Sequence, residues 1–162
     1  MSNQESFEVV SGPKGIWGWN TIPILNLAFC VVSSLYFALM VHIPPFFNGS
    51  MSGLLSSHSE TYNPMLAILV CVEVVVYFVM VAFSVYALGL VWRRSVRYPK
   101  IAKRFFWGVA IFTALDNIAA MLVGVNVDPS VARRVIGSVM FAWIWASYYA
   151  KSLRIKNTFV NP

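Results

Sequence analysis

Charged residues are scarce in this sequence of 162 residues, and long stretches lack them altogether. Only 11% of the residues are Asp, Glu, Lys or Arg, whereas a soluble domain carries about 25%. Residues 15–57 contain none of the four types, and residues 135–150 contain none either. We therefore predict that lipid, rather than water, surrounds most of this chain.

Cysteine is equally sparse, and the familiar catalytic motifs are missing. Cys30 and Cys71 both lie in apolar stretches, so we expect each to pack as a small apolar side chain rather than to form a disulfide. The sequence contains no phosphate-binding glycine loop, nucleophile elbow, HExxH or CxxCH motif. His42 and His58 are lone imidazoles without nearby ligand partners. We expect no enzyme, no cofactor and no metal site.

Four apolar stretches approach the length of a membrane-spanning helix, which is about 20 residues for roughly 30 Å of hydrocarbon. We expect spans over residues 16–41, 64–92, 105–123 and 131–150. Residues 46–63 are rich in Ser, Gly and Asn and are expected to form a loop. The sequence predicts an all-α integral membrane protein, a left-handed four-helix bundle that comprises residues 14–150.

Basic residues indicate the orientation of this bundle. Ten of the twelve Lys and Arg lie in the segment up to Lys14, in the joint 93–104 and in the tail after residue 150. The other two are Arg133 and Arg134. Short loops rich in Lys and Arg stay cytoplasmic. We predict that both termini are cytoplasmic, with residues 1–13 as a mobile N-terminal tail and residues 151–162 as a basic C-terminal tail.

Nine of these basic residues are candidates for contact with anionic lipid headgroups, each contributing about 1 kcal/mol. They are Arg93, Arg94, Arg97, Lys100, Lys103, Arg104, Lys151, Arg154 and Lys156. The alternative is that they only set the topology, and both statements can hold together. Because the positive charge flanks the apolar stretches, we expect no nucleic acid as a partner.

Two carboxylates lie inside the predicted spans. Glu73 and Asp116 are expected at similar depths near the bilayer midplane, where a charge costs about 3 kcal/mol. Carboxylates at this depth usually face the interior of a helix bundle and pair with another polar group. One interpretation is a proton or cation relay, and the other is a structural hydrogen bond between helices. Tyr77 and Ser84 follow Glu73 at helical spacing and are candidate partners.

Further polar residues are candidates near the same place. Arg134 precedes a stripe of small residues at steps of four, which favours close helix packing. We expect Arg134 on the packed face, where it reaches Asp116 as an ion pair or as part of a gated path, with Asp128 as a surface partner. Asn117 and Thr113 are expected to hydrogen-bond across helices.

The two ends of the sequence resemble a known family. Residues 145–159, WASYYAKSLRIKNTF, are similar to the last span and tail of the YdgK-like family of small bacterial inner-membrane proteins of unknown function. Further matches are Gly15-Ile-Trp-Gly18-Trp19, Glu73, Tyr98-Pro99 and Asp116. Leu153 stands where that family commonly has Lys. The resemblance implies four spans and an inner-membrane location, and it implies no activity.

Three function classes follow from these residues. The first is a non-catalytic accessory or interaction protein that forms a homo-oligomer or associates with a larger membrane complex or with anionic phospholipid. The second is a small proton-coupled carrier or channel-like protein that uses Glu73 and Asp116. The third, a membrane enzyme, is disfavoured by the missing motifs. In the tail, Phe159 is expected to insert among acyl chains beside an amphipathic basic segment, or to dock on a partner protein.

Overall fold

This computed structural model describes residues 15–16, 18–125 and 130–161. The predicted N-terminal tail of residues 1–13 and the predicted surface partner Asp128 lie outside these ranges. Within them, all regular elements are helices, and the only extended pairing is the isolated bridge between Ser95 and Asn161. The prediction of an all-α chain is confirmed.

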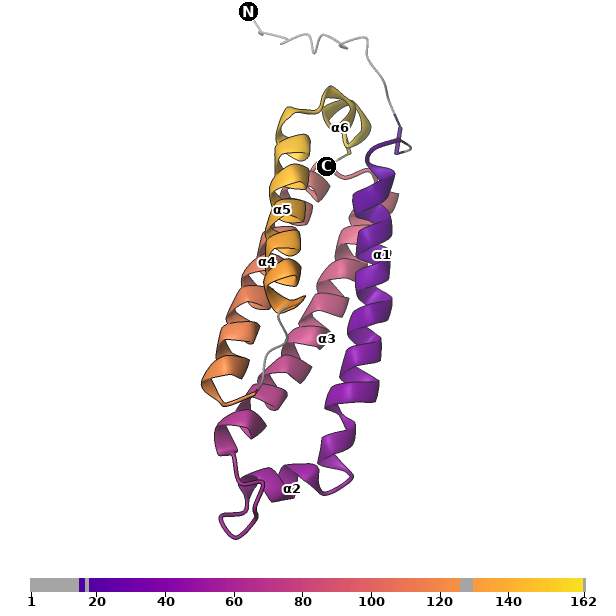
Figure 1. The fold of residues 1–162 in the computed structure, drawn as a ribbon. Coiled ribbons are helices and arrows are strands. Elements are labelled where there is room, and N and C mark those ends of the chain that lie inside the picture. The colour runs from indigo at the N-terminus through magenta and orange to yellow at the C-terminus, as the bar shows by residue number, and fades with distance from the viewer. Residues whose placement is uncertain (1–14, 17, 126–129, 162) are drawn as a thin grey trace, which may run out of the picture.

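Long helices form the body of the molecule. They are α1 (Thr21–Tyr36), α3 (Pro64–Trp92), α4 (Tyr98–Leu122) and α5 (Ser130–Lys151). Figure 1 shows them side by side, with α1 packed on α3, α3 on α4 and α4 on α5.

Shorter helices lie at the two ends of this body. A π-helix, η1 (Phe37–His42), continues α1 and leads into the 3₁₀ turn η2 (Pro44–Phe46) and then α2 (Ser50–Leu55). The helix α6 (Leu153–Thr158) follows α5. In Figure 1, α2 lies across one end of the long helices, and α6 lies with the C-terminus at the other. We refer to these as the α2 end and the α6 end.

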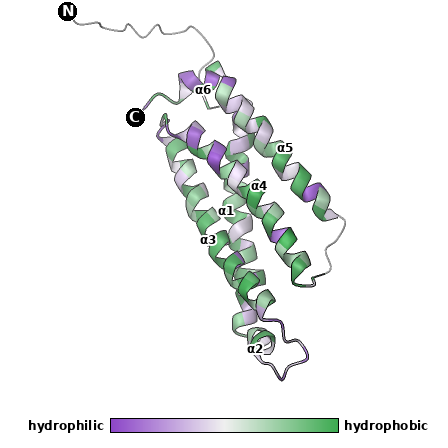
Figure 2. Cartoon of the chain, turned by 90° about the vertical axis from the view of Figure 1, so that its left-hand side faces the viewer, coloured by the Kyte–Doolittle hydropathy of each residue, from purple (hydrophilic) through white to green (hydrophobic). Residues whose placement is uncertain are grey.

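Three of the described helical segments are long and apolar enough to cross a membrane: Thr21–Phe46, Pro64–Trp92 and Tyr98–Leu122. Figure 2 shows hydrophobic residues along the long helices and hydrophilic ones gathered toward the α6 end. The helix α5 is not among the three. Its charged residues Arg133, Arg134 and Lys151 lie near its ends and leave an uncharged run of only 16 residues, 135–150.

Two elements differ from the sequence-based expectation. The helix α4 begins at Tyr98 rather than Phe105, because Pro99 lies in its first turn, where a missing N–H costs nothing. Residues 98–104 of the predicted basic joint 93–104 are therefore helical. The expected loop 46–63 also contains α2, which begins after Gly49 at φ +83°. Both differences reflect local turn geometry that apolar periodicity does not report.

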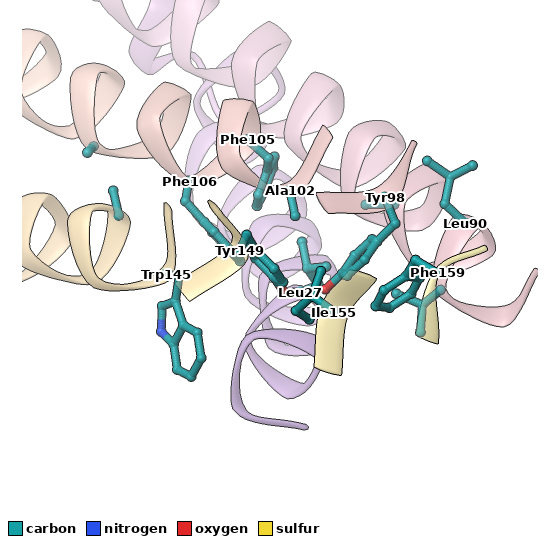
Figure 3. Close-up of a cluster of buried hydrophobic side chains, with 14 residues drawn as sticks. Leu27, Leu90, Tyr98, Ala102, Phe105, Phe106, Trp145, Tyr149, Ile155 and Phe159 are labelled. Carbon is teal, nitrogen blue, oxygen red and sulfur yellow. Dashed lines mark hydrogen bonds between the residues drawn. The ribbon is translucent and has the colours of Figure 1, made fainter. Parts of the chain in front are cut away.

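The described core is concentrated at the α6 end (Figure 3). It unites Leu27 of α1, Tyr98 of α4, Tyr149 of α5, Ile155 of α6 and Phe159 after it, all at most 4% exposed. The Tyr98 and Tyr149 hydroxyls are hydrogen-bonded at 2.7 Å. The rings of Tyr98 and Phe159 lie 4.6 Å apart, centre to centre. The prediction that Phe159 inserts among acyl chains is wrong, because its ring packs inside the protein.

Candidate functional site

Ionisable side chains meet between η1, α3 and α4, in what we call the polar cluster: His42, Glu73, Tyr77 and Asp116. Glu73 lies nine residues after the first residue of α3, which is about 14 Å along the helix axis. Asp116 lies six residues before the last residue of α4, which is about 9 Å. Both residues thus lie in the half of their helix toward the α2 end. Their position near the bilayer midplane stays a prediction.

His42 and Glu73 form the contact at the centre of the polar cluster. His42 Nε2 lies 2.7 Å from Glu73 Oε2, and the two side chains are only 13% and 15% exposed. His42 Nδ1 lies 2.9 Å from the Phe37 carbonyl oxygen, which can only accept, so Nδ1 carries a hydrogen and donates it. The remaining ring nitrogen and the carboxyl oxygen therefore share one proton, either as an ion pair or as a neutral hydrogen bond.

The backbone that carries His42 is irregular. In η1 the hydrogen bonds skip five residues, and the Ile43 N–H donates to the Ala38 carbonyl at 2.9 Å. Pro44 and Pro45 follow and offer no N–H to continue the helix. Single π-helical turns occur frequently at functional sites. Here the wider turn brings the last residue of η1 against α3.

One aromatic ring packs against the imidazole, and two more contact that ring. The Tyr77 ring, one turn further along α3 than Glu73, lies 5.0 Å from the His42 ring. It stacks on Phe37 at 5.9 Å and meets the edge of Phe112 at 6.4 Å. These rings separate the polar groups from the apolar surroundings of the helices.

Asp116 joins the cluster from α4. Its carboxyl group lies within interaction range of that of Glu73. Asp116 Oδ1 is buried and has no hydrogen-bond partner among the described residues. The polar cluster therefore holds a shared proton between His42 and Glu73, with a second carboxyl group beside that pair.

The other candidate residues behave differently from the sequence-based expectation. Arg134 is exposed on α5 and lies within electrostatic range of Tyr77. The structure does not show its predicted ion pair with Asp116, and the Glu73 carboxylate pairs with His42 instead.

The amide of Asn117 and the hydroxyl of Thr113 also stay within their own helix. Asn117 Nδ2 donates to the Thr113 carbonyl at 2.6 Å, and Thr113 Oγ1 donates to the Val109 carbonyl at 2.8 Å. The predicted cross-helix bonds of these two residues are wrong. Ser84 is fully buried on α3, and its hydroxyl has no hydrogen-bond partner, so it does not join the cluster either.

His42 is the residue that sequence reasoning missed. The sequence shows it as a lone imidazole without ligand partners at close spacing, and Glu73 is 31 residues away along the chain. One feature of the sequence could have identified it. His42 lies at the end of one apolar stretch, and the next apolar stretch contains the carboxylate of Glu73. Across residues 15–16, 18–125 and 130–161, no group of three or more His, Cys, Asp or Glu is arranged to hold a metal ion.

The predicted headgroup residues all belong to elements at the α6 end. Arg93 caps α3, Arg97 precedes α4, and the others lie in the joint, the first turns of α4, the last turn of α5, and α6. Figure 2 shows this hydrophilic end of the bundle. Arg154 differs from the rest because its guanidinium lies directly on Gly18.

The two ends of the chain meet in a set of contacts that we call the terminal clamp. The Gly15 N–H donates to Thr158 Oγ1 at 3.0 Å. Gly18 has φ +96°, and a side chain there would collide with the guanidinium of Arg154. The residues that carry the resemblance at both termini therefore contact one another, which gives them a structural role.

The tail also holds the joint between α3 and α4. The Val96 N–H donates to the Asn161 carbonyl at 2.7 Å, and the Asn161 N–H donates to the Arg94 carbonyl at 3.1 Å. Asn161 Nδ2 donates to the Arg93 carbonyl at 2.9 Å. Together with the Phe159 ring on Tyr98, these bonds fix the last residues against the bundle.

A comparison with family models identifies one family over nearly the whole chain, at residues 13–160. No curated protein and no solved structure matches this chain. The similarity to the YdgK-like family in particular stays a prediction, because the matching model carries no such name. On the extent of the match, the chain belongs to the family described as protein of unknown function DUF2569.

Proposed function

We propose that this chain is a multi-pass protein of the bacterial inner membrane, without enzymatic activity, and that α5 is its fourth span. Three helices have the length and apolarity of spans, and α5 packs along α4. The long side chains of Arg133 and Arg134 can reach the interface from the start of α5. Basic residues at the α6 end favour a cytoplasmic position for that end and for both termini.

Within this membrane protein, the polar cluster takes up and releases protons, as in a small proton-coupled carrier or channel-like protein. The observation that carries this proposal is the 2.7 Å contact between His42 Nε2 and Glu73 Oε2. Because Nδ1 is occupied by the Phe37 carbonyl, this contact exists only while the pair holds a proton. When that proton leaves, a lone pair on nitrogen faces a carboxylate, and the contact breaks.

Proton release would therefore break a contact between two helices. The His42–Glu73 contact joins the end of η1 to α3, and η1 leads through η2 into α2. Asp116, beside that pair, offers a second carboxyl for the same proton. Tyr77 and Arg134, from α3 and α5, are the other ionisable groups in range. Proton occupancy is in this way linked to the position of the α2 end.

The test is proton movement in proteoliposomes that contain the parent chain or one of three variants: Glu73→Gln, Asp116→Asn and His42→Gln. Glu60→Gln is the matched control, because Glu60 is an exposed carboxylate outside the cluster. We expect proton flux in the parent and the control, and loss of flux in the cluster variants with their folding intact. Flux that persists in all three cluster variants would contradict the proposal.

A non-catalytic accessory role is the second candidate. It is favoured by the arrangement of the outer helices, because α1 contacts chiefly α3 and η1, and α5 contacts chiefly α4. That arrangement leaves faces of both helices available to another membrane protein or a second copy. If the parent moves no protons, and the cluster variants lose their native oligomer or complex in mild detergent, the polar cluster is a structural joint and this role is supported.

A further inference from the structure

An apolar groove of about 370 Å³ runs between α3 and α4, a volume within the range of small-molecule sites. Its walls include Val79 and Phe83 of α3 and Phe105 and Phe112 of α4. Arg104 is the only charged residue in its lining. The groove therefore has apolar walls and one cationic side chain.

A second hollow, of about 500 Å³, adjoins this groove on the side toward α5. It shares Arg104 and Gly108 with the groove and adds Lys100, Lys103 and Trp107. No ion pair engages its three basic residues among the residues that the structure describes. Three positive charges thus lie beside the apolar groove, all within the first two turns of α4.

We infer that the groove and the adjoining basic hollow together bind one molecule of anionic phospholipid. Its phosphate would lie among Lys100, Lys103 and Arg104, and one of its acyl chains would lie between α3 and α4. Basic pockets between membrane helices are known sites for acidic headgroups. An indole such as that of Trp107 is suited to the headgroup level, where its ring meets apolar chains and its N–H meets polar groups.

Charge complementarity favours this occupant over a second copy of the chain. Each copy has a formal net charge of +6, and a partner copy would bring further positive charge to the same basic hollow. A phospholipid supplies both the negative charge and the apolar chain. The inference depends on α3 and α4 being membrane spans and does not depend on proton binding at the polar cluster.

The first test measures lipid adducts of the purified full chain by native mass spectrometry in detergent, with phosphatidylglycerol and phosphatidylcholine offered in equal amounts. We expect one preferred phosphatidylglycerol per chain. Arg104→Gln is expected to weaken that adduct about five-fold, the equivalent of one basic contact. Arg97→Gln is the matched control, because Arg97 lies in the same joint but lines neither hollow.

The second test fills the groove. A Cβ at Gly108 meets no atom within 4 Å, so Gly108→Leu places a side chain in the groove without a backbone clash. Gly89→Leu is the control, because Gly89 is equally unobstructed on α3 and lines neither hollow. We expect Gly108→Leu to abolish the adduct and the control to retain it.

Three outcomes would overturn the inference. They are equal binding of the two lipids by the parent, full lipid binding by both Arg104→Gln and Gly108→Leu, and a parent dimer that Gly108→Leu separates into monomers. The last would assign the groove to a second copy. Loss of proton flux in the polar-cluster variants has no bearing on these readouts, so the two proposals can fail separately.

Discussion

The two ends of the bundle hold their helices together with different chemistry. At the α6 end, rings from α4, α5 and the tail pack closely, and neutral hydrogen bonds to backbone groups join Thr158 to Gly15 and Asn161 to Arg93. At the α2 end, the helices meet through His42, Glu73 and Asp116, with one carboxylate oxygen buried and unpartnered. The His42–Glu73 contact exists only with a proton in place, whereas the ring packing and backbone bonds of the α6 end do not depend on one. The α2 end also has a neutral bond, because Asn63 Nδ2 donates to the Val123 carbonyl at 3.0 Å.

Stable packing at the α6 end and sensitivity to protonation at the α2 end thus lie at opposite ends of the protein. Aromatic packing and backbone hydrogen bonds hold the α6 end without a titrating contact, and its buried Asn20 amide has no hydrogen-bond partner among the described residues. A cluster of ionisable groups beside a π-helical turn gives an end whose contacts change with proton occupancy. Four experiments test the contrast, from the largest expected effect to the smallest.

Phe159→Ala should damage the α6 end most. Removal of a buried Phe ring costs about 3–5 kcal/mol of unfolding free energy, and the Phe159 ring is 3% exposed. Thermal unfolding in detergent, followed by circular dichroism, measures the loss. Phe29→Ala is the control, because the Phe29 ring is 67% exposed on α1. Equal effects of the two substitutions would show that the tail does not stabilise the bundle.

Gly18→Ala should loosen the terminal clamp. A residue with a side chain at φ +96° costs about 1–3 kcal/mol, and its Cβ also collides with the Arg154 guanidinium. The added substitution Arg154→Ala should recover the part that is due to the collision. Gly137→Ala, where a Cβ meets nothing within 4 Å, should be neutral or stabilising. A Gly18→Ala chain as stable as the parent would contradict the geometry of the clamp.

The His42–Glu73 contact can be measured by a double-mutant cycle with His42→Gln and Glu73→Gln. We expect a coupling energy of about 1–3 kcal/mol, because each single change leaves a mostly buried partner unsatisfied. The cycle of His58→Gln and Glu60→Gln uses the same residue types at exposed positions and should show no coupling. Additivity at His42 and Glu73 would mean that the contact contributes nothing to the α2 end.

Tyr98→Phe should have the smallest effect of the four. It removes the hydroxyl that is bonded to Tyr149 at 2.7 Å and costs about 0.5–1.5 kcal/mol. The double variant Tyr98→Phe with Tyr149→Phe should cost little more, because neither hydroxyl is then left unsatisfied. Thermal unfolding again measures both. A strongly additive loss would indicate a different partner for one of the hydroxyls.

Much of the helical architecture was accessible from the sequence. Runs without charge predicted the long helices, because apolar residues at this density leave few alternatives. The start of α3 at Pro64 followed from proline chemistry alone. The early start of α4 and the presence of α2 were missed, since both depend on turn geometry around Pro99 and Gly49.

The candidate site was only partly accessible. The carboxylates of Glu73 and Asp116 attracted notice because charge is rare within apolar stretches, and the structure brings them together. The partnership with His42 and the burial of Phe159 depend on how distant segments pack, which periodicity in one sequence does not encode. The structure also does not show the predicted Arg134–Asp116 pair, because helix rotation decides where a side chain points.

The burial of Tyr98 by Phe159 also constrains how the molecule is made. These two residues are 61 positions apart in the sequence, so Tyr98 is synthesised well before the ring that covers it. Until Phe159 is synthesised, no ring packs against Tyr98 from the tail. A chain that stops short of Phe159 lacks this ring, and we expect Tyr98 to stay uncovered in it.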